Sequence, residues 1–286
     1  MEVSRSEQND ASGVLQSWPD ALAERMGIEP EAFPRAADMD ALTLRGSIEN
    51  EKLRLHQIAA LLHAEYGTPD LGNKPDPVDE LVYIILSRRT REAAYQEAYR
   101  ALKRRYSKWD EVVVAPLEEI AEVIRRSGLA EKKARSIQNA LRAIRDEFGS
   151  CTLDSTVAWT NEELVNFLCS LDEVGPKSAL CVLLMSFGRD VFPVDAHVGR
   201  VLSRVRPYAA LGLRLHGRTQ KERQRILADV IPPDARKSLH INLILHGRRV
   251  CLSGVPKCGR CVIADDCLFE RKQEPVDDRI DGSVAA

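Results

Sequence analysis

The segment Leu171-Asp172-Glu173-Val174-Gly175-Pro176-Lys177-Ser178-Ala179 joins two runs of helical character by a very short connection. A helix that carries Leu164, Phe167 and Leu168 is predicted to end in a tight turn at Gly175. Pro176 favours the first position of a new helix, where its fixed φ fits and its missing N–H is not needed. The segment therefore predicts a helical hairpin that exposes backbone N–H groups at a helix N-terminus, a natural seat for a phosphate.

Lys177 falls in the first turn of the second helix, where the helix dipole disfavours a positive charge. This position makes the neutral, nucleophilic amine easier to reach and therefore suits covalent catalysis. A surface lysine that donates to a DNA phosphate is an equally good interpretation of the residue taken alone.

Another helix is predicted to begin in the segment 194–198 (VDAHV), eighteen residues after Lys177. Asp195 is a suitable N-cap for that helix. A carboxylate at the mouth of a cleft also stabilises a developing cation or moves a proton for Lys177. The two roles are compatible, because a cap holds the carboxylate in place. We expect His197 to pack or to contact the backbone rather than to take part in catalysis.

Four cysteines near the C-terminus, Cys251, Cys258, Cys261 and Cys267, have the spacing C-x6-C-x2-C-x5-C within seventeen residues. Four thiolates this close in sequence are able to surround one soft metal centre, either a tetrahedral zinc or an iron–sulfur cube. Disulfides are the weaker interpretation, because the cysteine total is odd at seven and no secretory signal peptide is evident. The spacing lacks the two C-x2-C pairs usual for zinc, which favours a [4Fe–4S] cluster without settling the choice.

The composition is that of an ordinary globular protein. Its 286 residues, 44% hydrophobic and 29% charged, suffice for one large or two modest domains. The longest apolar run, Ala179–Met185, is too short to cross a bilayer, so no membrane association is expected. The net charge of −2 implies that a polyanionic partner must be met by a local basic patch.

Apolar residues recur at helical spacing through most of the chain, and sustained strand alternation is absent, which predicts an all-α protein. The clearest examples are Leu55, Ile58, Ala59 and Leu62; Leu117, Ile120, Ala121 and Ile124; and Ala134, Ile137, Leu141, Ile144 and Phe148. The turn-rich segment 67–77 (GTPDLGNKPDP) is a candidate domain boundary, and a second break falls at 192–194.

Basic residues gather in three stretches, 100–108, 125–135 and 200–225. Such residues either form solvated helix faces or line a groove that neutralises phosphates without recognising bases. The charge pattern by itself does not distinguish the two.

Taken together, these segments resemble the endonuclease III branch of the helix-hairpin-helix DNA glycosylases over about residues 76–268. The resemblance rests on VGPKSA at 174–179, FPVDAHVGRV at 192–201, LILHGRRVC at 243–251 and the cysteine spacing that follows. It implies an all-α helix-hairpin-helix glycosylase fold, with two helical domains flanking a DNA-binding cleft and a C-terminal iron–sulfur cluster loop.

The resemblance also implies a division of the chain. Residues 46–75 and 190–268 are expected to form the iron–sulfur cluster domain, and residues 76–189 the helical barrel domain with the hairpin. Residues 1–45 are an N-terminal extension, partly disordered and without an assigned function, and residues 269–286 are a C-terminal tail.

By resemblance, Lys177 matches the catalytic nucleophile and Asp195 the essential carboxylate. The damaged base is flipped out of the duplex, and the Lys177 amine attacks C1′ of the sugar as the base leaves. A Schiff base forms, β-elimination then cuts the strand, and Asp195 stabilises positive charge on the sugar. The cysteines are expected to hold a structural [4Fe–4S] cluster. Expected DNA contacts come from Arg88, Arg89, Val174, Gly175, Ser178, Lys257 and Arg260.

The implied partner is double-stranded DNA with a damaged, mismatched or abasic site, bound by a monomer. The expected location is the cytoplasm, on the nucleoid, in a bacterium, or the nucleus in a eukaryote.

Three features depart from the family pattern. Glu173 stands where the hairpin usually has a glycine, and a carboxylate there repels phosphate unless it turns away. Arg89 stands where the family usually has a glutamine that fills the hole left by the flipped base. The Arg-Arg-Thr at 88–90 is similar to thymine–guanine mismatch glycosylases, which usually lack the lysine at position 177. The segment 178–184 (SALCVLL) with FPVD also resembles plant 5-methylcytosine glycosylases.

Several functions therefore compete. The first is a bifunctional glycosylase and abasic-site lyase acting on oxidised pyrimidines, and its variant is excision from T/G or U/G mismatches or of modified cytosine. The second is a non-catalytic DNA-binding iron–sulfur protein, which the presence of both Lys177 and Asp195 disfavours. The third is a zinc-stabilised helical module.

Overall fold

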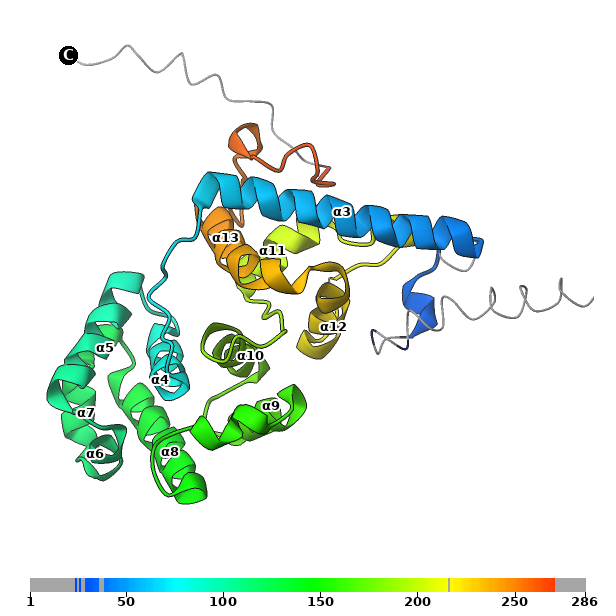
Figure 1. The fold of residues 1–286 in the computed structure, drawn as a ribbon. Helices are drawn as coiled ribbons and strands as arrows, with labels where there is room; N and C mark the ends of the chain where they lie inside the picture. The colour runs from blue at the N-terminus through cyan, green and yellow to red at the C-terminus, as the bar shows by residue number, and fades with distance from the viewer. Residues whose placement is uncertain (1–23, 25, 27–28, 36–38, 216, 271–286) are drawn as a thin grey trace, which may run out of the picture. The chain divides into compact units, whose positions relative to one another are not determined.

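The computed structural model describes residues 24, 26, 29–35, 39–215 and 217–270 (Figure 1). This part of the chain contains helices and no strand, which confirms the all-α prediction. It divides into two compact units, one from residue 70 to residue 193 and the other from the segments up to residue 69 and from residue 194 onward. Residues 1–23 of the expected N-terminal extension and residues 271–286 of the expected C-terminal tail lie outside the described residues.

The unit at 70–193 is built around α4, whose side chains are buried on all sides. A helix that is apolar all round belongs in the centre of its domain, and α4 contacts α5, α8 and α10. The helices of this unit are α4 (Pro77–Ser87), α5 (Glu92–Arg105), α6 (Trp109–Val114), α7 (Leu117–Val123), α8 (Ala130–Phe148), α9 (Asn161–Ser170) and α10 (Pro176–Met185), with 3-10 turns η2 (Arg125–Ser127) and η3 (Asp154–Ala158).

The helical periodicity of α8 is confirmed at four of the five predicted apolar positions, and the fifth, Phe148, is half-buried. Ala134, Ile137, Leu141 and Ile144 are all buried, as the spacing of one apolar face requires. The helix ends at Gly149, whose φ of 79° is left-handed, and the Gly149 N–H donates to the carbonyl of Arg145.

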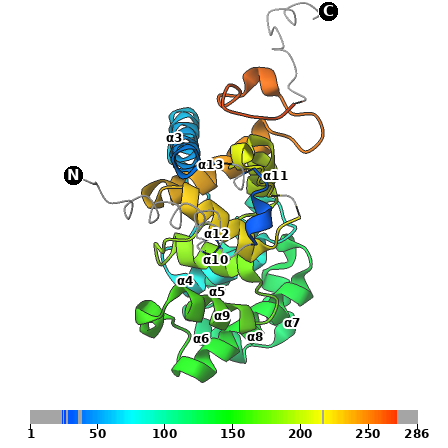
Figure 2. The same ribbon diagram turned by 90° about the vertical axis from the view of Figure 1, so that its right-hand side faces the viewer.

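The other unit contains α3 (Ala41–Tyr66), α11 (Ala196–Val205), α12 (Gln220–Val230) and α13 (Arg236–Arg249). Short 3-10 helices accompany them: η1 (Pro30–Ala32), η4 (Ala209–Leu211), η5 (Pro233–Ala235) and η6 (Cys258–Arg260). Helix α13 lies against both α3 and α11, as both views show (Figures 1 and 2). A Cβ at Gly247 would approach the Cβ of His197 to 2.9 Å, so only glycine permits this close crossing of α13 and α11.

Part of the predicted N-terminal extension belongs to this unit. Phe33 is buried edge-to-face against Tyr208, with ring centroids 6.4 Å apart. Helix α3 begins at Ala41, where Asp40 caps it by accepting from the N–H of Thr43. No helix in the described ranges has the length and apolar character needed to cross a membrane.

Candidate functional site

The predicted hairpin is present between α9 and α10. A capping box between Thr160 and Glu163 starts α9, and Gly175 is the N-cap of α10 with Pro176 at its first position, as expected. The left-handed residue of the turn, however, is Glu173 with a φ of 61°, whereas Gly175 has an extended backbone. The turn therefore places its conformational strain on a charged residue rather than on a glycine.

Gly175 faces open space. A Cβ at Gly175 would meet no atom within 4 Å, and the Gly175 N–H makes no hydrogen bond within the described chain. Val174, in contrast, is buried, and its N–H donates to the carbonyl of Leu171. The Ser178 N–H donates to the carbonyl of Gly175. Of these hairpin residues, Gly175 is therefore the one that offers an unused backbone donor.

Lys177 is the second residue of α10 and is half-buried. Its charge acts on Glu80, a fully buried carboxylate of α4. Burial raises the pKa of Glu80, and this is opposed by hydrogen bonds from Lys74 and Asn73 and by the charges of Lys74 and Lys177. Sequence reasoning missed Glu80, although a carboxylate inside the apolar run of α4 was a usable signal.

The arginine loop, defined as Arg88, Arg89 and Thr90, follows α4 and is held in place by hydrogen bonds from a buried lysine. Lys133 of α8 is 5% exposed, and its Nζ donates to the carbonyls of Leu86 and Ser127 at 2.7 Å each and to Thr90 Oγ1 at 2.5 Å. Thr90 Oγ1 in turn donates to the carbonyl of Ser127. Lys133 was counted with the basic residues of the 125–135 stretch, but it anchors the loop instead of facing solvent.

We expect Lys133→Met to change the pH dependence of stability. Burial, and next the charge of Arg88, lowers the pKa of Lys133 from 10.5 to about 8. The unfolded chain therefore binds this proton more tightly than the folded chain does. As a result, the free energy of unfolding of the wild type increases as pH rises from about 8 to 10.5. The variant lacks this increase with pH. It also leaves the carbonyls of Leu86 and Ser127 without their lysine donor, which lowers the free energy of unfolding by about 2 kcal/mol. Denaturant unfolding at pH 7 and pH 10 measures both effects, and an equal stability difference at the two pH values would contradict the assignment.

Arg89 and Leu129 are both exposed and both left-handed, with φ of 51° and 50°. They line one open pocket together with Arg88, Lys132, Lys133 and Ser136. Left-handed backbone is uncommon for leucine and arginine, and such strained residues cluster at binding and active sites. Leu129 was not identified from the sequence, because a single leucine before a helix carries no periodic signal.

Four of the five basic residues in the stretch 100–108 already have acidic partners. Arg100 and Arg104 both bind Glu97, Lys103 binds Asp79 and Arg105 binds Glu119. This stretch therefore matches the interpretation as a solvated helix face.

Asp195 caps α11, as predicted: its Oδ1 accepts from the N–H of Val198 at 2.7 Å. Its other oxygen, Oδ2, makes no hydrogen bond within the described residues. His197 packs against Gly247, and its Nδ1 lies 3.0 Å from Nη2 of Arg200. The packing role expected for His197 is confirmed.

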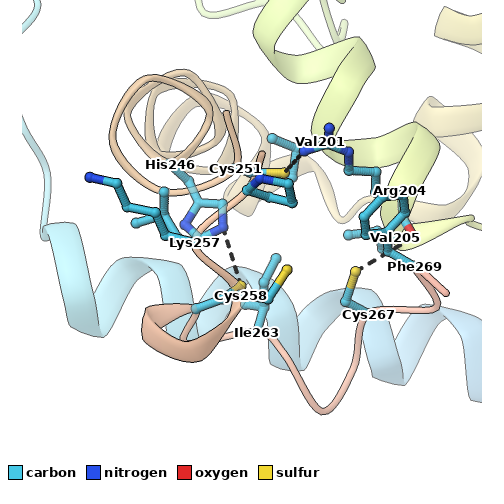
Figure 3. A pocket seen from close by; sticks show the side chains of 13 residues that line it. Val201, Arg204, Val205, His246, Cys251, Lys257, Cys258, Ile263, Cys267 and Phe269 are labelled. Carbon is cyan, nitrogen blue, oxygen red and sulfur yellow. Dashed lines mark hydrogen bonds between the residues drawn. The ribbon is translucent and has the colours of Figure 1, made fainter. Parts of the chain in front are cut away.

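The four cysteines line one pocket with the apolar residues Val201, Val205 and Ile263 (Figure 3). Two arginines of α11 hold the cysteine loop by its backbone: Arg200 Nε donates to the carbonyl of Cys251 at 2.9 Å, and Arg204 Nη1 donates to the carbonyl of Leu252 at 2.7 Å. Both belong to the basic stretch at 200–225, so part of that stretch serves the loop.

Two donors reach the cysteine sulfurs. Arg204 Nη1 lies 3.1 Å from Sγ of Cys251, and His246 Nε2 lies 3.4 Å from Sγ of Cys261. Burial lowers the pKa of His246 to about 4, so the ring is neutral near pH 7. Its Nδ1 lies 3.0 Å from the hydroxyl of Tyr66, and in the tautomer in which that hydroxyl donates to Nδ1, Nε2–H faces the sulfur of Cys261. His246 was quoted in the cysteine motif, but its role was not foreseen.

No three or more His, Cys, Asp or Glu side chains are arranged to hold a single metal ion in the part of the chain that the structure describes. The donor set nevertheless fits an iron–sulfur cluster: four thiols, apolar walls and N–H donors to sulfur. Lys257 and Arg260 on the same loop are exposed.

The chain matches the sequence model of the HhH-GPD superfamily base excision DNA repair proteins over residues 82–233. It is 34% identical to a protein of Arabidopsis thaliana named as a DNA glycosylase, over 66% of this chain and 64% of that one. It is 32% identical to endonuclease III of Synechocystis sp., over 79% of this chain and 96% of that one.

Two solved structures share its fold. One is a trapped endonuclease III–DNA covalent intermediate, with a TM-score of 0.63 at 25% sequence identity. The match covers 76% of this chain and 95% of the endonuclease III chain. The other is a thermostable thymine-DNA glycosylase, with a TM-score of 0.65 at 21% sequence identity. The match covers 79% of this chain and 99% of the glycosylase chain.

Proposed function

The chain belongs to the endonuclease III family within the HhH-GPD superfamily of base excision DNA repair proteins, and from this premise we propose that it excises oxidised pyrimidines through a Schiff base on Lys177. It is a DNA glycosylase of base excision repair. The abasic-site lyase step and the choice of base are the proposed parts. The observation that supports the lyase step is the position of Lys177 in the first turn of α10, two residues after Gly175 of the hairpin.

In this proposal the hairpin binds the DNA backbone. The exposed Gly175 lets a phosphate approach closely, and its unused N–H donates to that phosphate. Arg88, Arg89 and Ser178 add contacts near it, and the exposed Lys257 and Arg260 bind phosphates from the cysteine loop. The side chain of Val174 supports the hairpin from within rather than meeting DNA, because it is buried.

The amine of Lys177 attacks C1′ of the flipped nucleotide, the C1′–N bond breaks, and the electron pair leaves with the base. One Nζ proton passes to the departing base. The nitrogen lone pair then breaks the bond between C1′ and the ring oxygen, which takes a proton from solvent, and the protonated imine forms. Loss of a C2′ proton to solvent forms the C2′=C3′ double bond and breaks the C3′–O bond, so that the 3′ phosphate leaves. Asp195 stabilises the positive charge on the sugar through Oδ2, while Oδ1 remains bound to the N–H of Val198.

The residues that would hold a [4Fe–4S] cluster are Cys251, Cys258, Cys261 and Cys267. Such a cluster would cross-link the loop that carries Lys257 and Arg260, and the proposed reaction requires no redox step from it. The N–H groups of Arg204 and His246 stabilise charge on the sulfurs. We expect a monomer that acts on double-stranded chromosomal DNA, in a bacterial cytoplasm or a eukaryotic nucleus.

Strand cleavage on a panel of duplexes tests the proposed function. The panel holds an oxidised thymine, a T/G mismatch, a methylated cytosine and a preformed abasic site. Cleavage of the abasic and oxidised substrates supports the proposal. Base release from T/G alone, seen only after alkali, would favour the mismatch glycosylase instead.

Arg89→Gln is expected to shift the choice of substrate. The exposed Arg89 is positioned to pair with a guanine left without its partner, because a guanidinium matches the acceptors of guanine. Loss of that pairing should lower the ratio of T/G to oxidised-pyrimidine excision by about tenfold, from the 1–3 kcal/mol that a bidentate pair contributes. Single-turnover rates measure the ratio. Arg142→Gln, an exposed arginine of α8, is the control, and an unchanged ratio for Arg89→Gln would remove the mismatch alternative's main support.

A further inference from the structure

Glu173, the left-handed residue of the hairpin, is bound by two cations from other elements. Arg88 of the arginine loop donates from Nη2 to the Glu173 carboxylate at 2.5 Å and from Nη1 to the Glu173 carbonyl at 3.0 Å. Lys132, in the first turn of α8, places its Nζ 3.1 Å from the other carboxylate oxygen. The carboxylate is thus turned toward two positive charges on the same surface as the hairpin.

These contacts are open to solvent. The exposed fraction is 30% for the Glu173 side chain, 40% for Arg88 and 61% for Lys132. Ion pairs at such exposure are weak and readily exchanged. The hydrogen bonds from Arg88 and Lys132 hold the pKa of Glu173 below its usual value, so the carboxylate is charged at neutral pH. A DNA phosphate that approaches Arg88 and Lys132 must therefore compete with a negative charge already in place.

We propose that Glu173 is an internal counter-anion that limits the binding of undamaged DNA. This inference rests on the proposed function, since it requires DNA phosphates at the hairpin surface. Phosphate contacts supply affinity without recognising bases, and a cation already paired with a carboxylate releases fewer counterions when it meets a phosphate. Glu173 thereby lowers affinity for any duplex while leaving the contacts to a flipped base intact. The protein therefore dissociates more readily from undamaged DNA, and a larger share of the binding free energy at a damaged site comes from the contacts to the flipped base.

Glu173→Gln tests this with the full-length protein and an undamaged duplex. The dissociation constant is measured between 50 and 200 mM salt. Removing the charge should make the slope of log Kobs against log salt steeper by about 0.9, the value for one further phosphate contact. Across that fourfold range of salt, the variant should lose about 3.5-fold more affinity than the wild type.

Two further variants test whether the change in slope comes from the charge at position 173. Glu173→Gly also removes the charge and suits the φ of 61°, so it should fold and show the same steeper slope. Glu131→Gln changes the net charge equally, on an exposed side chain of α8 that forms no ion pair with any described residue, and should have a smaller effect.

An unchanged or shallower slope in both Glu173 variants would overturn the inference, and so would an equal change in Glu131→Gln. A shallower slope would mean that Glu173 positions Arg88 and Lys132 for DNA instead of neutralising them. These outcomes leave the proposed function standing. Failure of the wild type to bind any duplex would instead count against the proposed function itself.

Discussion

Lys177→Gln is expected to abolish covalent trapping by borohydride on duplex DNA that carries an abasic site. Glutamine has no amine to form an imine, so no adduct is available for reduction. The rate of strand cleavage should fall at least about 1000-fold, equivalent to about 4 kcal/mol of transition-state stabilisation. The measurement is the amount of protein–DNA adduct on a denaturing gel, wild type beside variant.

DNA affinity and the unfolding midpoint of Lys177→Gln should stay near the wild-type values, because Lys177 is only half-buried. Lys52→Gln on α3, whose lysine pairs with Glu49, is the matched control and should trap normally. A variant that still forms the adduct would place the imine on another amine. A variant that fails to fold would make Lys177 a structural residue. Absence of an adduct with the wild type, while DNA is bound, would favour a monofunctional glycosylase or a binding protein.

Cys258→Ser is expected to remove the bound cluster and to destabilise the unit that contains α3, α11 and α13. Binding free energy of a structural metal centre is also folding free energy, since the unfolded chain has no preformed site. A loss of about 3 kcal/mol would lower the unfolding midpoint by roughly 6–12 °C. Freshly purified wild type should contain about four irons per chain with a broad absorbance in the visible range, and the variant should lose both.

The matched control is Cys169→Ser on α9, a half-buried cysteine outside the pocket, which should retain iron and colour. A colourless wild type with one bound zinc would replace the cluster by the zinc alternative. A Cys258→Ser protein that is equally stable and equally rich in iron would show that Cys258 is not a ligand.

Local sequence signals were sufficient for much of the architecture. Pro176 and Gly175 defined the start of α10, and Asp195 the start of α11, because capping depends on residues within one turn of the helix end. The buried face of α8 followed from its apolar spacing in the same way. The cysteine spacing predicted one shared site, and the four thiols do line one pocket.

The tertiary structure decided which charges have partners. Arg88 and Glu173 are 85 residues apart in sequence and yet form an ion pair, while Lys133 is buried beneath the arginine loop. Arg200 and Arg204 anchor the cysteine loop some fifty residues downstream. A count of charges along the chain cannot distinguish a lysine that faces solvent from one that holds a loop. The difference depends on desolvation and on acceptors contributed by distant segments, which exist only once the helices have packed.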